Sequence, residues 1–266
     1  MFAAVIPARN EAPQLEKVIR TLLSLPVDLI IPVINGCTDN SLEKVKKNLH
    51  PQIVLVHYKE ALGIDIPRAI GAKLAFDRGA GGVLFLDGDM SGDIAENLRG
   101  LLDPIIRKEA DLTLTDCYPE THPRELSFLA RYLLKIRREF NKEAGLLKTI
   151  GAASPSHGPH AVSRRLLRVI PFRELAIPPA TLALVARQRL AVAVGATIPH
   201  KTLGSPEKNP KHARLVAETI IGDYLEAFCL YRGEKRSRSD GQKEYIGYHL
   251  ERRWDLLEEF CSASSD

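Results

Sequence analysis

Cysteine is scarce in this 266-residue chain. The four cysteines, Cys37, Cys117, Cys229 and Cys261, lie far apart and form no CxxC pair. Structural zinc sites and disulfide-stabilised domains need closely spaced or more numerous cysteines. The cysteine pattern therefore argues against both classes and fits a protein of the reducing cytoplasm.

Long hydrophobic runs and a strong charge of either sign are also missing. No run of about 18 apolar residues occurs, so we expect no membrane-spanning helix. The apolar N-terminal run follows no basic segment and is interrupted at Pro7 and Arg9, which does not fit a secretory signal peptide. The formal net charge is only +4, from 37 Lys and Arg against 33 Asp and Glu, and gives no indication of a nucleic-acid partner.

The first 116 residues alternate short apolar runs with helical patterns. Strands that are apolar on both faces and separated by helices indicate a parallel sheet covered on both sides. Such sheets bind ligands at the carboxyl ends of their strands. We therefore predict an α/β fold with a mostly parallel, Rossmann-like sheet. The expected strands are 2–7, 28–34, 52–57, 82–86 and 111–115, and the expected helices are 11–25, 39–49, 65–78 and 94–108.

The rest of the chain is richer in helical patterns. A helix predicted at 124–144 has an apolar stripe with basic flanks, which fits packing on the sheet, a homodimer interface or peripheral contact with a membrane. The polar run 233–243 has a composition typical of disorder. The other expected segments are a turn-rich stretch at 151–163, a helix at 179–189, a strand at 190–198, a Lys/Pro loop at 200–212, and helices at 215–231 and 244–260.

The sharpest motif is a buried strand that ends in Asp87, Gly88 and Asp89. Two carboxylates two residues apart at a strand end can face one point outside the sheet. Carboxylate oxygens suit Mg²⁺ and Mn²⁺, and Mg²⁺ usually completes its coordination with ligand phosphates and water. The motif therefore predicts a divalent-cation site for a diphosphate, although Asp and Gly also favour an ordinary turn.

Two other predicted strands end in polar segments. The first is followed by PARNE at 7–11 and has no GxGxxG glycines, which argues against an NAD or FAD site. The second ends in NGCTD at 35–39, where side chains could contact a base or ribose or could simply form a turn.

Taken in order, these segments resemble the family 2-like glycosyltransferases of the GT-A fold. That family typically shows a strand ending in PAxNE, a D/N-G-S-T-D turn, a G-x(3,4)-AR-type helix and a strand-ending DxD. The corresponding segments here are 7–11, 35–39, 63–71 and 87–89. The resemblance covers 1–116 well and 117–215 loosely, and it extends to retaining enzymes of the glucosyl-3-phosphoglycerate synthase and mannosylglycerate synthase type.

The resemblance implies a GT-A-like domain at 1–214, with a nucleotide-sugar half at 1–116 and an acceptor half at 117–214, followed by a C-terminal helical extension at 215–266. It also implies an enzyme, a hexosyltransferase that uses Mg²⁺ or Mn²⁺ and a UDP- or GDP-sugar donor. By analogy Asp89 would ligate the cation together with His200, with His212 as the alternative. The implied donor-binding residues are Pro7, Arg9, Glu11, Asn35, Asp39, Arg68, Asp87 and Gly88.

The acceptor half departs from the family pattern. Inverting members place an Asp or Glu near the start of a helix to deprotonate the acceptor hydroxyl, but the matching stretch LAIPPATLALVA has no acid. Asp116 and Glu174 are the nearest candidate bases. Otherwise the enzyme is retaining, with front-face attack assisted by the leaving diphosphate, which is the mechanism we favour.

The acceptor is expected to be a small molecule, either anionic or a lipid. His157 and His160 lie in the turn-rich stretch where the family places acceptor-binding loops, and imidazoles there could bind a phosphate or a carboxylate. Two alternatives to a transferase are a non-catalytic nucleotide-sugar-binding module and a nucleotidyltransferase, whose GxGxR loop is missing here. A haloacid-dehalogenase-like phosphatase would need its DxDx[ST] motif on the first strand, whereas residues 87–91 follow the fourth.

Overall fold

The computed structural model describes residues 1–48, 50–119, 126–206 and 209–263. In this part of the chain a seven-stranded sheet has the order β3-β2-β1-β4-β6-β5-β7, and β6 alone runs antiparallel to its neighbours. The mostly parallel α/β sheet expected from the sequence is therefore confirmed. The strands are β1 Ala3–Ala8, β2 Leu29–Asn35, β3 Val56–Tyr58, β4 Gly82–Phe85, β5 Leu112–Asp116, β6 His160–Ser163 and β7 Val192–Thr197.

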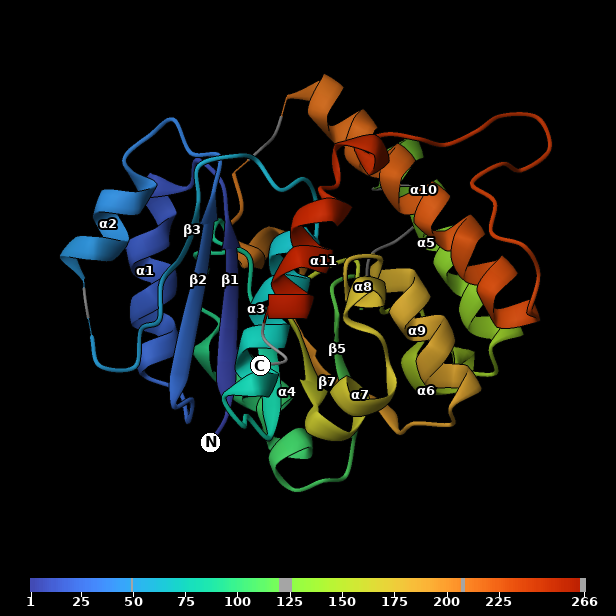
Figure 1. The fold of residues 1–266 in the computed structure, drawn as a ribbon. Helices are drawn as coiled ribbons and strands as arrows, with labels where there is room; N and C mark the ends of the chain where they lie inside the picture. The colour runs from blue at the N-terminus through green and yellow to red at the C-terminus, as the bar shows by residue number, and fades with distance from the viewer. Residues whose placement is uncertain (49, 120–125, 207–208, 264–266) are drawn as a thin grey trace.

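Helices cover both faces of the sheet (Figure 1). The α-helices are α1 Ala12–Leu23, α2 Ser41–Lys47, α3 Ile66–Asp77, α4 Ala95–Ile106, α5 Phe128–Glu143, α6 Leu147–Ile150, α7 Arg164–Val169, α8 Phe172–Leu175, α9 Pro178–Arg187, α10 Pro210–Arg232 and α11 Trp254–Ala263. Two 3-10 helices, η2 and η3, cover His200–Leu203 and His249–Glu251. None of the described helices is both long and apolar enough for a membrane span.

Alternation along β1 produces two hydrophobic cores. Ala3 and Val5 face the core that contains α3, α5, α9 and α10, whereas Ala4 and Ile6 face the core that contains α1 and α4. Helix α3 approaches β1 closely, because a Cβ added to Gly71 would lie 2.4 Å from the Cγ1 atom of Val5. This close packing brings the first turn of α3 to the end of the sheet where β1 and β4 terminate.

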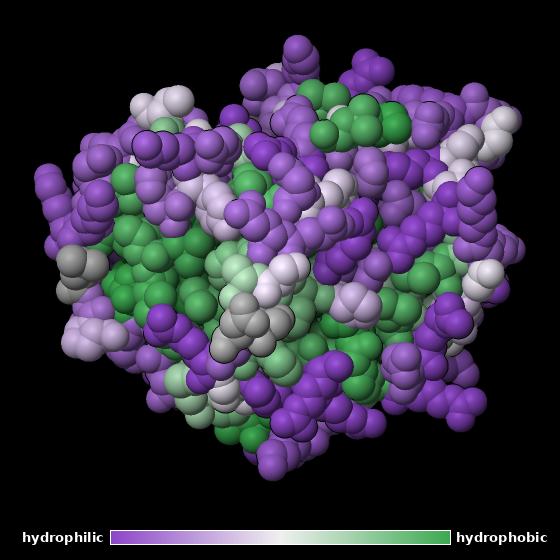
Figure 2. Space-filling view, in the orientation of Figure 1, coloured by the Kyte–Doolittle hydropathy of each residue, from purple (hydrophilic) through white to green (hydrophobic). Residues whose placement is uncertain are grey.

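The short strand β3 forms one edge of the sheet, next to β2. Its residues are half-buried or exposed, and Figure 2 shows an apolar area over β2 and β3, framed by hydrophilic side chains. Strand β3 covers only 56–58, so it is shorter than the strand predicted at 52–57, and it pairs with β2 alone.

Two expectations for the second half of the chain were wrong, and a third was right only in part. The turn-rich stretch 151–163 ends in strand β6, which lies between β4 and β5. The helix expected at 244–260 begins only at Trp254. The run 233–243 is part of the described fold and anchors itself through Arg238, which is 6% exposed and bonds to Asp223 and Glu226 on α10.

The predicted helix at 124–144 corresponds to α5, with residues 124 and 125 outside the described part of the chain. Its buried face packs against α10, and Phe140 contacts Tyr224 and Phe228 edge-on. Much of its apolar stripe is therefore covered within the chain.

We expect Arg238→Met to lower the free energy of unfolding by about 3–5 kcal/mol, because it leaves two buried carboxylates without this partner. Urea denaturation measures the change. Lys235→Met, an exposed position on the same segment, is the control and should change stability by less than about 0.5 kcal/mol. Equal small effects from both variants would mean that this segment is not docked on α10.

Candidate active site

A cavity of about 890 Å³ opens at the carboxyl ends of β1, β2 and β4. Its opposite wall comes from the first half of α10 and from the segment that follows α10, including Tyr248 and Glu251. A ligand at the strand ends would therefore lie between the sheet and the C-terminal part of the chain. This position is the one that parallel α/β sheets use for binding.

Most of the residues expected to bind the donor meet in this cavity. Of that set Asp39 alone is missing from the described lining. Asn35 is held in place by two backbone contacts: its amide donates to the Ala8 carbonyl at 3.2 Å and its oxygen accepts from the Leu62 N–H at 3.0 Å. The expected residues that line the cavity are Pro7, Arg9, Glu11, Asn35, Arg68, Asp87, Gly88 and Asp89.

Asp39 instead fixes the backbone beside the cavity. Its carboxylate accepts from the N–H groups of Ala12 at 3.1 Å and Ser41 at 2.9 Å, joining the starts of α1 and α2. Partial burial raises the pKa of Asp39, but these hydrogen bonds outweigh it and leave the pKa below its usual value. The structure thus gives Asp39 a capping contact and does not bring it to the cavity.

The DGD motif at the end of β4 is paired with an arginine from α3. Arg68 donates from Nη2 to Oδ2 of Asp87 at 2.8 Å and from Nη1 to Oδ1 of Asp65 at 2.8 Å. Burial lowers the pKa of the guanidinium, but the carboxylates of Asp87 and Asp65 raise it more. The buried Nε of Arg68 has no hydrogen-bond partner. A cationic group is therefore fixed between the strand end and the cavity.

The chain after β7 packs directly on this motif. Ser205 donates its hydroxyl to Oδ1 of Asp89 at 3.2 Å, and the Gly92 N–H donates to the Leu203 carbonyl at 2.9 Å. A Cβ on Gly92 would lie 2.0 Å from the Thr202 carbonyl oxygen, so the two segments meet without room for a side chain there.

The two histidines considered as metal ligands occupy different places. His200, the first choice, is not part of the described cavity lining, and its Nδ1 lies 3.2 Å from Nε2 of His157. His212, the alternative ligand, lines the cavity, and its Nδ1 lies 2.8 Å from the hydroxyl of Tyr248. Within the described residues no group of three or more His, Cys, Asp or Glu side chains could hold a metal ion.

The amino-acid sequence matches the model of one protein family, described as Glycosyl transferase family 2, over residues 3–170. The chain belongs to glycosyl transferase family 2. A search of curated proteins found no match.

Solved structures of glucosyl-3-phosphoglycerate synthase from Mycobacterium tuberculosis share the fold of this family member. The complex with phosphoglyceric acid has a TM-score of 0.59 and 20% sequence identity, and the match covers 90% of this chain and 82% of that one. The complex with Mn²⁺, UDP and glucosyl-3-phosphoglycerate has a TM-score of 0.58 and 18% identity, with the same coverage. The GT-A-like fold expected from the sequence is therefore confirmed.

The two candidate bases, Asp116 and Glu174, do not line the described cavity. Glu174 is 7% exposed and accepts from Nη2 of Arg236 at 2.7 Å. Asp116 accepts from the Tyr118 N–H at 2.9 Å, at the end of β5. Both carboxylates thus have structural contacts away from the strand ends of β1 and β4.

The C-terminal part of the chain contributes residues to this site that the sequence did not predict. Asp223, Tyr248 and Glu251 all line the cavity, although they lie well over a hundred residues from the DGD motif. No local pattern marks them, because their role depends on how α10 and the following segment fold back over the sheet.

We expect Glu174→Gln to leave the rate of sugar transfer unchanged, because Glu174 lies outside the cavity. The same variant should lower the free energy of unfolding by about 1–3 kcal/mol, because it weakens a buried hydrogen bond to a charged group. Release of the nucleoside diphosphate and urea denaturation measure the two effects. A large loss of turnover at normal stability would instead identify Glu174 as the base.

Proposed function

We propose that this protein transfers a sugar from a nucleotide-diphospho-sugar to an acceptor hydroxyl. One observation carries the proposal: Asp87 and Asp89 meet Arg68 and the ends of β1 and β2 in one large cavity. A guanidinium suits a diphosphate, and carboxylates suit the cation that accompanies it. Membership of glycosyl transferase family 2 supports the same chemistry.

The carboxylate oxygens at the end of β4 fit a Mg²⁺ or Mn²⁺ ion. Asp89 would hold the ion directly, and Asp87 would contact ribose or a metal-bound water. Mg²⁺ commonly uses one or two carboxylates and takes its other ligands from phosphates and water. The site therefore does not require a histidine ligand. Of the two candidate histidines, His212 lines the cavity and His200 does not. When bound, the ion would neutralise charge on the departing nucleoside diphosphate.

UDP is the first nucleotide to test. The solved structures of glucosyl-3-phosphoglycerate synthase include complexes with Mn²⁺ and UDP-glucose and with Mg²⁺ and UDP. In this chain the nucleoside would lie among Pro7, Arg9, Glu11 and Asn35, with GDP as the alternative.

We propose that an anionic group of the acceptor binds near Arg137, which lies outside the described lining of the main cavity. Arg137 on α5 is 3% exposed, its buried Nε has no hydrogen-bond partner, and it forms no ion pair within the described part of the chain. Burial lowers the pKa of both His157 and His200, and the Arg137 guanidinium lowers both further. These imidazoles are therefore neutral near pH 7, and Arg137 supplies the positive charge.

Burial raises the pKa of the Tyr224 hydroxyl and the charge of Arg137 lowers it, and this hydroxyl begins a series of hydroxyl groups that leads to the main cavity. The Tyr224 hydroxyl donates to Ser154 at 2.6 Å, and Ser154 lies 2.8 Å from Ser156, which lines the cavity. We therefore propose a small anionic acceptor, a phosphate or carboxylate, rather than a lipid. Phosphoglyceric acid and glycerol 3-phosphate are bound in the related M. tuberculosis structures.

The placement of Asp116 and Glu174 supports a retaining mechanism. Inversion needs a base on the far side of the anomeric carbon, and the two sequence-derived candidates lie outside the cavity. In the retaining alternative the acceptor hydroxyl attacks on the face that the diphosphate leaves, and the departing phosphate oxygen accepts its proton.

We expect Asp89→Asn to lose most of the metal-dependent stabilisation by UDP or GDP, because it removes a charged oxygen ligand. At a nucleotide concentration about a hundredfold above Kd, binding stabilises a protein by about 2.7 kcal/mol. Thermal unfolding with and without Mn²⁺ measures the change. Asp93→Asn, an exposed carboxylate on the same loop, is the matched control.

The metal assignment fails if Asp89→Asn keeps the wild-type response. A wild type that binds the nucleotide but never hydrolyses or transfers the sugar, even slowly, would favour the non-catalytic binding module.

We expect Arg137→Met to raise the KM for an anionic acceptor about 10- to 100-fold, because a hydrogen bond to a charged group contributes about 1.5–3 kcal/mol. UDP release with 3-phosphoglycerate, glycerate or glycerol as acceptor measures the effect. Arg138→Met, the exposed neighbour on α5, should behave as wild type, and the Kd for UDP should not change. An equal loss with glycerol would remove the anionic subsite.

A further inference from the structure

The segment that follows α10 docks against the loop before α3. The Arg253 N–H donates to the Leu62 carbonyl at 2.9 Å. Gly63 has φ +82°, and a Cβ there would lie 2.3 Å from the Glu251 carbonyl oxygen. Backbone meets backbone at this point, so the position of the C-terminal segment is tied to the start of α3.

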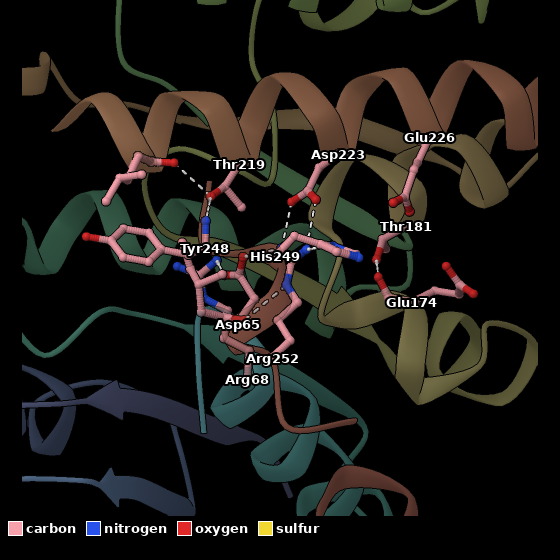
Figure 3. Close-up of polar contacts among 12 residues, drawn as sticks. Asp65, Arg68, Glu174, Thr181, Thr219, Asp223, Glu226, Tyr248, His249 and Arg252 are labelled. Carbon is pink, nitrogen blue, oxygen red and sulfur yellow. Dashed lines mark hydrogen bonds and ion pairs between the residues drawn. The ribbon is translucent and has the colours of Figure 1, made fainter. Parts of the chain in front are cut away.

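Arg252 lies at the centre of this contact and is fully buried (Figure 3). Its guanidinium holds Asp223 of α10 with two hydrogen bonds, Nη2 to Oδ2 at 2.7 Å and Nη1 to Oδ1 at 2.9 Å. Nη2 also lies 3.5 Å from Oδ2 of Asp65, and Nε donates to the Ile64 carbonyl at 3.3 Å. One side chain thus links α10 to the N-terminus of α3.

Asp65 divides its two oxygens between two arginines. Oδ2 faces Arg252, while Oδ1 accepts from Nη1 of Arg68 at 2.8 Å. Asp65 also has φ +62°, a conformation that few non-glycine residues adopt, and it immediately precedes α3. The contacts with Arg252 and Arg68 therefore help to determine how this residue is oriented.

Arg68 carries the connection to the DGD motif. Its Nη2 donates to Asp87 at the end of β4. A continuous series of ion pairs thus runs from Asp223 through Arg252, Asp65 and Arg68 to Asp87. Coupling between separated positions is carried by such contiguous networks.

We propose that Arg252 is a positioning residue for diphosphate binding: it holds Asp65 so that Arg68 faces the cavity beside Asp87. This inference rests on the proposed function of the cavity. Without Arg252, both oxygens of Asp65 can turn toward Arg68, and the guanidinium then moves away from Asp87. Burial raises the pKa of Asp65, an effect that Arg68 and Arg252 oppose.

The test separates diphosphate binding from nucleoside binding. With Mg²⁺ present, Arg252→Met should raise the Kd for UDP about 3- to 30-fold, the range typical of coupling through a network. The Kd for uridine, which does not reach Arg68, should not change. Calorimetry measures UDP and ligand-observed NMR measures uridine, with GDP and guanosine used if the wild type prefers them.

Two further variants define the mechanism. Arg253→Met changes the adjacent, partly exposed arginine, whose side chain bonds Asp255, and should leave both affinities unchanged. In the double variant of Arg68→Met and Arg252→Met, the loss should be no greater than for Arg68→Met alone, because Arg252 acts through Arg68. If Arg252→Met does not fold, Arg252→Lys can be used, because it keeps the positive charge but cannot form the paired hydrogen bonds of a guanidinium. It should show the same selective loss of affinity for UDP.

The outcomes are distinct. A wild type that binds neither nucleoside diphosphate overturns the proposed function of the cavity. A wild type that binds UDP, with an Arg252 variant that keeps this affinity, overturns the positioning role. An equal loss for UDP and uridine, or additive losses in the double variant, would also overturn it by showing a general structural effect.

Discussion

The ion pair between Arg68 and Asp87 is the contact on which the site depends. It joins α3, on one face of the sheet, to the carboxyl end of β4, and both residues line the cavity. The pair exists because Gly71 allows α3 to pack closely on β1. The tight helix–sheet packing thus determines where a charged group can face a ligand.

The C-terminal part of the chain completes this arrangement rather than standing apart from it. Helix α10 runs without a break through residue 214, where the sequence suggested a boundary, and its Asp223 anchors both Arg238 and Arg252. Buried ion pairs often add little net stability compared with apolar packing, but removing one partner is costly. The network therefore makes the orientation of the segment after α10 specific.

The sequence predicted those parts of the fold and site that depend on local signals. Apolar runs and turn residues located β1, β2 and β4, and the polar strand ends brought Asn35 and Asp89 to one cavity. The short antiparallel β6 was missed because its pairing with β4 and β5 depends on distant residues. Arg238 was hidden in a polar run, since nothing in its composition shows that its charge is matched by Asp223 and Glu226.

The charges in the cavity explain why a divalent cation suits the site. A bound diphosphate would face the carboxylates of Asp87 and Asp89, and two like charges at 4 Å repel by about 4 kcal/mol at an effective dielectric constant of 20. Arg68 carries one positive charge, which it already shares between Asp87 and Asp65. A bound diphosphate would add further negative charge beside these carboxylates. A cation that contacts both the carboxylate and the phosphate oxygens turns that repulsion into attraction, so donor and metal should bind this cavity as a pair.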